Sequence, residues 1–192
     1  MNSSTSTPIT VNEPGTGTLE IFPLPTDEEF LKRLLEDLFA NHWQEFYFGT
    51  MVQGSVFEIK APGPPKKIGL LDGYLTVDFG PWHFHLCIGT TKGMPGRPTE
   101  LEVAKQRQTA RAEFYRGITD DRCVGHWGFR MFNGNGDNQL TIFLPNPFLS
   151  DEMKVLKTPD WSRLNLWDDL RKTYLGLEPD PKDRTSTKLV HG

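Results

Sequence analysis

The spacing of apolar residues predicts a long helix near the N-terminus. Between Phe30 and Phe46, leucine and aromatic residues recur at helical spacing, and charged residues occupy the opposite side. Thr26 and Glu29 have the spacing of a capping box, in which each side chain accepts a hydrogen bond from the other residue's backbone N–H. We therefore expect an amphipathic helix that starts after Thr26 and buries one face.

The middle of the chain alternates between apolar and polar residues with a period of two, which is typical of strands. The expected strands are 18–22, 56–60, 74–79, 82–89, 110–118, 126–132 and 139–144. The segment Asn133-Gly134-Asn135-Gly136-Asp137 separates the last two, and Asn-Gly between alternating segments predicts a hairpin. Short links between strands favour antiparallel pairing.

A C-terminal helix is expected after Thr158-Pro159-Asp160, which combines a cap with a proline suited to a first turn, and Gly176 supplies a stop. The fold class is therefore α+β, with a curved, mostly antiparallel sheet of about six strands packed against an N-terminal and a C-terminal helix. This element order is similar to the helix-grip arrangement. We expect residues 1–17 to form a flexible leader, 18–177 a single domain and 178–192 a flexible charged tail.

Composition narrows the function classes. The net charge is −4, from 25 acidic and 21 basic residues, and no long block of one sign occurs. This argues against nucleic-acid partners and against a polybasic membrane patch. No apolar stretch is long enough to span a membrane, and no signal peptide is recognisable. With only two cysteines, Cys87 and Cys123, a reducing compartment is expected, so we predict a soluble, cytoplasmic protein.

The strand that contains His83, His85 and Cys87 is the best candidate for a functional site. Alternate side chains of a strand point to opposite faces, so these three share one face, with Trp82, Phe84 and Leu86 on the other. Imidazoles at i and i+2 can both reach one metal ion. A divalent metal is therefore predicted, most simply zinc, with iron or copper as alternatives.

The segment His83-Phe84-His85 resembles the strand motif of α-type carbonic anhydrases, where a His-Phe-His strand holds zinc. The resemblance covers about seven residues and implies a third histidine about two dozen positions later, where this sequence has Gln106 and Thr109. Cupins also use a His-x-His strand. We take both families as examples of the geometry and assign the chain to neither.

The remaining site residues must come from other strands. His126 follows Cys123 closely and is the fourth candidate metal ligand, after His83, His85 and Cys87. Arg130 shares strand parity with His126 and could orient a substrate, and Glu58 is a candidate catalytic carboxylate.

Three functions remain open. The first is a small metal-dependent enzyme with hydrolase or lyase chemistry on a small substrate. The second is a non-catalytic domain that binds a hydrophobic or tetrapyrrole-like ligand such as haem in a cavity lined by Phe and Trp, with a histidine on the iron. The third is an assembly partner that uses the histidine face as an interface, and a homo-oligomer is compatible with all three.

Overall fold

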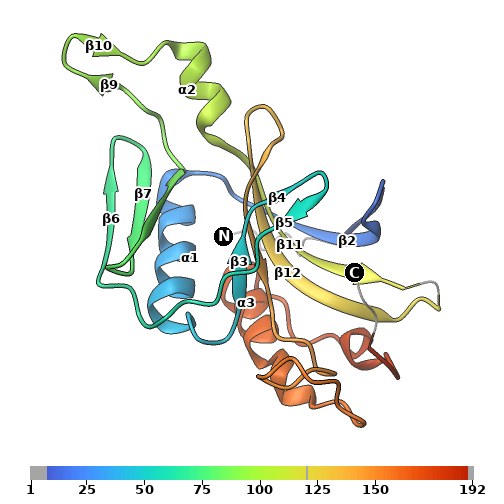
Figure 1. The fold of residues 1–192 in the computed structure, drawn as a ribbon. Coiled ribbons are helices and arrows are strands. Elements are labelled where there is room, and N and C mark those ends of the chain that lie inside the picture. Colours follow the sequence, from blue (N-terminus) through green and yellow to red (C-terminus); the bar gives the residue numbers. More distant parts are fainter. Residues whose placement is uncertain (1–7, 120, 190–192) are drawn as a thin grey trace. The chain divides into compact units, whose positions relative to one another are not determined.

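The fold is α+β and contains a six-stranded antiparallel sheet with the order β1-β2-β11-β12-β13-β3 (Figure 1). The computed structural model describes residues 8–119 and 121–189. Three smaller sheets accompany the large one: β6-β7-β8, β4-β5 and β9-β10. The predicted class, with about six mostly antiparallel strands and a helix towards each end of the chain, is confirmed.

The chain divides into two compact units. The described residues of unit 1 are 8–23, 113–119, 121–129 and 143–189, and unit 2 comprises Leu24–Ala112 and Arg130–Ile142. Each unit combines segments that are distant in sequence. Local patterns carry no information on such a division, because they describe only neighbours along the chain.

Helix α1 (Glu28–Asn41) of unit 2 follows the predicted pattern. Its fully buried residues lie along one stripe, which is Leu31, Leu34, Leu35, Leu38 and Phe39. The cap differs from the prediction, because Asp27 and not Thr26 occupies the N-cap. The Asp27 carboxylate accepts a hydrogen bond of 2.9 Å from the backbone N–H of Phe30. A carboxylate at this position also interacts favourably with the positive end of the helix dipole.

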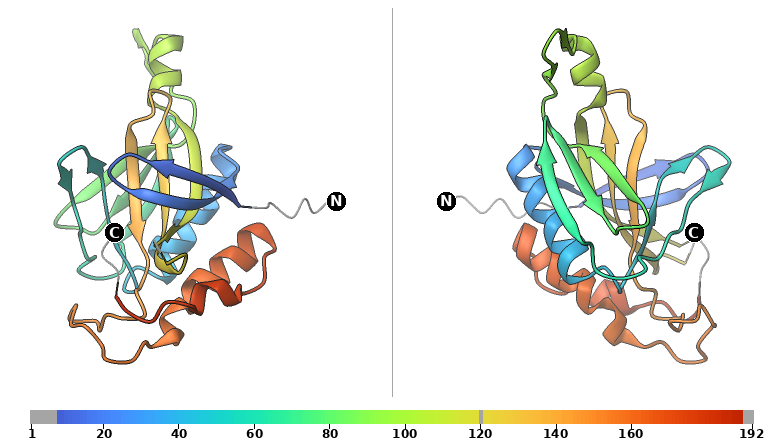
Figure 2. Two further views of the ribbon diagram at one scale, coloured as in Figure 1. Left: turned by 90° about the vertical axis from the view of Figure 1, so that its right-hand side faces the viewer. Right: turned by 60° about the vertical axis from the view of Figure 1, so that its left-hand side comes forward.

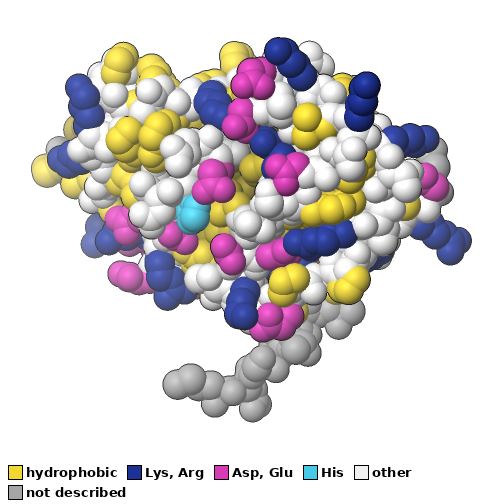
Figure 3. Space-filling model, turned by 90° about the horizontal axis from the view of Figure 1, so that it is seen from below, with side chains coloured by type: hydrophobic (Ala, Val, Ile, Leu, Met, Phe, Trp, Pro, Cys, Tyr) yellow, Lys and Arg dark blue, Asp and Glu magenta, His cyan; other side chains and the backbone are white. Residues whose placement is uncertain are grey.

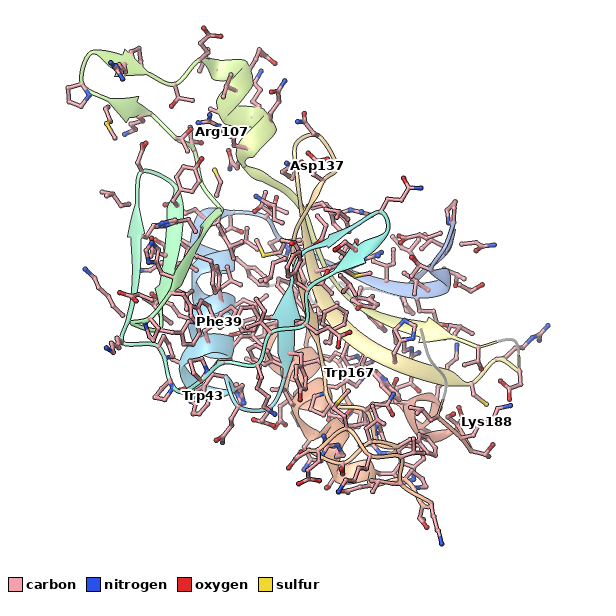
Figure 4. All side chains as sticks on the ribbon, viewed as in Figure 1. Phe39, Trp43, Arg107, Asp137, Trp167 and Lys188 are labelled. Carbon is pink, nitrogen blue, oxygen red and sulfur yellow. The ribbon has the colours of Figure 1, made fainter. Side chains whose placement is uncertain are left out.

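A three-stranded antiparallel sheet of β6 (Lys67–Leu71), β7 (Tyr74–Asp78) and β8 (His83–Cys87) lies beside α1 in unit 2 (Figures 1 and 2). Phe39, labelled in Figure 4, connects the helix to this sheet. Its ring lies 5.3 Å from Phe84 and 6.4 Å from Phe79, between ring centroids. Phe48 lies 5.0 Å from the same ring, so aromatic contacts join helix and sheet into one core.

The remaining elements of unit 2 are short or shared with the large sheet. They are β3 (Tyr47–Gly49), β4 (Met51–Val52), β5 (Ser55–Val56), β9 (Gly93–Met94), β10 (Arg97–Pro98) and α2 (Leu101–Arg107), with parts of β11 (Thr109–Ile118), β12 (Val124–Asn133) and β13 (Asn138–Phe143). The Asn-Gly hairpin is confirmed between β12 and β13, where Asn133 N–H donates to Asp137 O at 3.0 Å. The strand predicted at 56–60 is reduced to β5 and one bridge between Ile59 and Phe48.

Unit 1 contains β1 (Ile9–Glu13), β2 (Gly17–Leu24, up to Pro23), a 3-10 turn η1 (Trp161–Leu164) and α3 (Asn165–Leu175). Asp160 caps η1, where its side chain accepts a hydrogen bond from Ser162 N–H, and α3 follows directly after η1 and ends at Gly176, the predicted stop. Gly176 has a φ of +68°, in the left-handed region that glycine enters without a steric penalty. Residues 1–7 of the predicted leader lie outside the described residues, and β1 lies within it, paired with β2.

The described part of the segment predicted as a flexible tail, residues 178–189, contains a second 3-10 turn, η2 (Pro181–Arg184). Its Asp183 is fully buried in unit 1. Each Asp183 carboxylate oxygen accepts from one arginine and one indole, and the four donors are Arg116 (2.9 Å), Trp127 (2.8 Å), Trp167 (2.9 Å) and Arg171 (3.1 Å). We call this arrangement the Asp183 cluster; Trp167 is labelled in Figure 4. It holds η2 in place.

The surface carries mixed charge. On the face seen in Figure 3, acidic and basic side chains are interspersed with hydrophobic ones, as expected from their scattered distribution in the sequence. Of the helices that the structure describes, none has the length and apolar character needed to cross a membrane.

Candidate ligand-binding face

The side of the β6-β7-β8 sheet that carries the two histidines is the candidate site, and we call it the outer face. In antiparallel strands, residues directly opposite one another share a face, so the register assigns its members to three cross-strand rows. The rows are Lys67–Asp78–His83 (the charged row), Gly69–Thr76–His85 (the middle row) and Leu71–Tyr74–Cys87 (the apolar row).

The other side of the sheet is apolar. It consists of Ile68, Leu70, Leu75, Val77, Phe84 and Leu86, which alternate with the outer-face residues along each strand. Leu75 and Val77 are fully buried. The outer face therefore stands on a packed layer that fixes its backbone, and its two exposed histidines contribute little to the core.

His83 and His85 lie next to each other on the outer face, as the strand alternation predicts. Their ring centroids are 5.0 Å apart with an interplanar angle of 72°, and both residues are exposed. Nδ1 of His85 lies 2.7 Å from the hydroxyl oxygen of Thr76, its cross-strand partner. In the tautomer in which Nδ1–H donates to Thr76, Nε2 keeps its lone pair for an electrophile. Histidines that bind metals usually have such a partner on the second nitrogen.

Cys87 is buried, although the two histidines on its face are exposed. The Cys87 carbonyl oxygen accepts from Thr109 Oγ1 (3.0 Å) and from Gln139 Nε2 (3.3 Å), so other segments of unit 2 cover the end of β8. Burial raises the pKa of the Cys87 thiol, which disfavours the thiolate that a metal would require.

The other predicted site residues lie on other elements. Arg130 is buried on β12, with its guanidinium 5.1 Å from the Phe132 ring centroid. Glu58 is exposed in the segment after β5. His126 belongs to unit 1, where its ring lies 5.9 Å from Tyr115. None of these residues is part of the β6-β7-β8 sheet.

A metal centre of the predicted kind finds no support. Within residues 8–119 and 121–189, no group of three or more His, Cys, Asp or Glu side chains could hold a metal ion. One physical reason is the burial of Cys87, which raises the pKa of its thiol and disfavours the thiolate that a metal would require. Two imidazoles remain, which is fewer than the three or four protein ligands of ordinary zinc sites.

Several of the aromatic residues expected to line a cavity lie in the core of unit 2. Phe39 and Phe46 are fully buried, and Phe48 is 2% exposed. A hollow of about 350 Å³ does occur between α1 and the start of β6, lined by residues that include Glu36, Ala40, Lys66 and Ile68. It contains no imidazole or aromatic side chain, so it does not match the predicted ligand cavity.

Three residues of the outer face escaped sequence reasoning: Lys67, Gly69 and Thr76. Thr76 lies on β7, directly opposite His85. Lys67 and Gly69 lie on β6, one strand further from β8, and the register places them in the rows of His83 and His85. The signal that could have revealed them is the tight turn Asp72-Gly73 between β6 and β7, because a two-residue hairpin fixes the register of its strands.

Comparison with known proteins gives a family match without a function. The model of a family of unknown function, DUF7676, matches residues 8–176. No curated protein matches the chain. Among solved structures, the chain is similar to the crystal structure of ChuX, with a TM-score of 0.42 and 12% sequence identity over 83% of this chain and 78% of that chain.

Proposed function

Because the chain belongs to DUF7676, a family of unknown function, we propose its function from its own residues: it binds a haem-type tetrapyrrole on the outer face, with His85 as an axial ligand of the iron. The observation that carries the proposal is the Thr76–His85 pair in the middle row. Its hydroxyl-to-Nδ1 distance of 2.7 Å orients an exposed imidazole and leaves Nε2 available.

The number of ligands favours a tetrapyrrole over a bare ion. Zinc in a structural or catalytic site takes three or four ligands from the protein, and the outer face offers two exposed imidazoles. Iron in a tetrapyrrole already has four nitrogen donors, so one or two axial ligands from the protein suffice, and histidine is a common one. The residues that are too few for a metal centre are therefore enough for a ligand that brings its own donors.

The two rows that flank His85 also suit an amphiphilic ligand. The charged row lies on one side of the middle row, and Leu71 and Tyr74 of the apolar row lie on the other. Leu71 is 81% exposed, and covering it with a ligand would remove apolar surface from water. Haem has carboxylates on one edge and apolar substituents on the opposite edge.

The test is a titration of the purified protein, without a His-tag, with ferric protoporphyrin IX, followed by the Soret absorption band. We expect an imidazole-type band shift that His85→Ala abolishes. Thr76→Val should weaken binding about 10- to 100-fold, because it removes the partner that orients the ligating ring. Metal-free protoporphyrin should bind more weakly than the iron form, because it offers the imidazole no metal.

His42→Ala is the matched control. His42 is a half-exposed histidine of unit 2, and its Nδ1 lies 2.8 Å from a Glu45 carboxylate oxygen, outside the outer face. Its removal should leave the titration unchanged. Equal binding by wild type and His85→Ala, or the absence of a band shift in the wild type, would refute the proposal. Stoichiometric zinc in the protein as purified would instead favour the metal-dependent enzyme.

A further inference from the structure

The side chain of Lys67 does not pair with the carboxylate opposite to it. Lys67 faces Asp78 in the register of β6 and β7. The Asp78 carboxylate instead accepts a hydrogen bond of 2.7 Å from the backbone N–H of Gly80. Among the residues that the structure describes, the Lys67 ammonium has no ion-pair or hydrogen-bond partner, and the residue is exposed.

Lys67 extends along its own strand towards the middle row. A Cβ atom placed on Gly69 would lie 3.6 Å from Lys67 Cε, so the lysine stem lies over the position where Gly69 lacks a side chain. Gly69 belongs to the same row as Thr76 and His85. The lysine therefore directs its positive charge towards the row that contains the exposed imidazole.

Gly69 itself needs an explanation. Its φ is not in the positive range, and a Cβ there would make only an ordinary van der Waals contact, so the backbone does not require glycine. Glycine inside a strand costs about 0.5–1 kcal/mol relative to alanine. A strand glycine without a conformational reason often marks a place where a ligand approaches the backbone closely.

From these observations we infer that Lys67 is the carboxylate-recognition residue of the outer face, and that the ligand is an anionic tetrapyrrole, bound flat over Gly69 with an acidic edge at the Lys67 ammonium. This inference rests on the proposed function and adds the charge and orientation of the ligand to it. Lys67 makes no contact with the iron in this arrangement, so it determines specificity while His85 supplies the axial bond.

The experiment compares two iron porphyrins, ferric protoporphyrin IX and its dimethyl ester, which has no carboxylate. Lys67→Met keeps the apolar stem and removes the charge, and Lys67→Arg restores it. We expect Lys67→Met to raise the Kd for the diacid about 5-fold, the effect of a solvent-accessible ion pair worth about 1 kcal/mol. Wild type should bind the ester about 5-fold more weakly than the diacid, and Lys67→Met should abolish this difference.

Two further variants separate the position of the charge from its presence. Lys66→Met is the control, because the Lys66 side chain lies against Gly80 and not over Gly69. It should leave both affinities unchanged. Gly69→Val keeps the lysine but fills the space beneath it, and should weaken binding of both porphyrins by obstructing the flat surface.

The outcomes distinguish this inference from the proposed function. Suppose that wild type binds the diacid through His85 and that Lys67→Met has the same affinities for the diacid and the ester as wild type. The role of Lys67 is then refuted, and the proposed binding site stands. If Lys66→Met has the same effect as Lys67→Met, the attraction comes from general charge and the specific pairing is refuted. If wild type shows no His85-dependent band, both the function and the inference are overturned.

Discussion

Replacement of Asp183 by asparagine should destabilise unit 1 strongly. The carboxylate is fully buried and accepts four hydrogen bonds, two from arginines whose side chains are 3% and 4% exposed. Asparagine has nearly the same shape, but it is neutral and presents an N–H₂ donor where two of these four donors point. The substitution therefore removes the countercharge and leaves buried donors without acceptors.

The two arginines differ in what remains after the substitution. Arg116 also donates to Glu20 (2.8 Å) and to Asp180 (2.8 Å), so it keeps two carboxylate partners. Arg171 keeps the rings of Phe22 and Trp167, 4.9 and 5.2 Å from its guanidinium carbon, and a longer-range attraction to Asp180 and Asp168. Its Nε has no hydrogen-bond partner among the residues that the structure describes. Burial already lowers the pKa of Arg171, so Arg171 accounts for most of the expected cost.

Removing one partner of a buried ion pair lowers the free energy of unfolding by about 3–5 kcal/mol. Because Arg116 retains two carboxylate partners, we expect a loss at the lower end of this range, about 3 kcal/mol. With a urea m-value of about 2 kcal/mol/M, the unfolding midpoint should fall by about 1.5 M. Urea unfolding followed by tryptophan fluorescence suits the measurement, because Trp127 and Trp167 are members of the cluster.

Asp169→Asn is the matched control, because Asp169 is an exposed residue of α3 in the same unit and should change stability by less than about 0.5 kcal/mol. Deletion of residues 178–192 should destabilise at least as much as Asp183→Asn, because it removes the whole of η2. If both Asp183→Asn and the deletion matched wild type, the assignment of a structural role to the cluster would be refuted, and the segment would behave as the flexible tail that the sequence predicts.

Two further predictions concern titration and reactivity. Glu20 is 12% exposed, and its burial alone would raise the pKa of its carboxyl group. Hydrogen bonds from Lys182 and Arg116 outweigh this effect and hold that pKa below the usual value of 4.5. The contribution of Glu20 to stability should therefore be full above about pH 4.5 and lost as the pH falls through the lower pKa of the folded state. Thermal unfolding of wild type and Glu20→Gln should show a Tm difference that shrinks on acidification, and a constant difference would contradict the assigned pairing. Iodoacetamide should modify Cys123, which is half-buried, before Cys87, because burial raises the pKa of the Cys87 thiol and so reduces its reactivity. If mass spectrometry of the native protein found Cys87 alkylated first, the protection of Cys87 from alkylation by burial would be disproved.

Local patterns predicted the elements well where one residue type decided the outcome. The apolar stripe of α1, the Asn-Gly hairpin and the glycine stop of α3 all follow from the chemistry of a few neighbouring residues. The N-cap was missed because Thr26 and Asp27 are adjacent and both can cap; the carboxylate interacts more favourably with the helix dipole. The strand predicted at 56–60 has the right alternation, but within it the pairing is limited to Val56 of β5, a backbone hydrogen bond from Phe57 to Thr50 and the bridge between Ile59 and Phe48.

The η2 turn could have been predicted from a signal already used elsewhere. Asp180-Pro181 repeats the combination of a capping acid and a proline in the first turn, and the Asp180 side chain accepts from Lys182 N–H at 3.0 Å. Its high charge made residues 178–192 resemble a solvated tail. The burial of Asp183 could not be predicted, because its four donors come from β11, β12 and α3, which only the tertiary fold brings together.

Strand alternation alone could not identify the cross-strand neighbours of the candidate site, and the reason follows from the geometry of a sheet. Strand alternation assigns residues to a face, and it correctly placed His83 beside His85. It contains no information about which strand lies next to β8. Across the sheet, Thr76 and Gly69 lie in the same row as His85, whereas the sequence suggested Cys87 along the same strand and His126 on another as its partners.

The alternation of β8 also separates stability from binding, which makes the outer face a suitable place to test function by mutation. Phe84 packs against Phe39 and Phe48 on the inner side, and the histidines on either side of it in sequence are exposed. The apolar side chains that alternate with the histidines therefore supply the buried area of this strand, and the exposed histidines contribute little of it. An outer-face substitution that changes ligand affinity acts on the ligand directly, because the layer that fixes the backbone beneath it is unchanged.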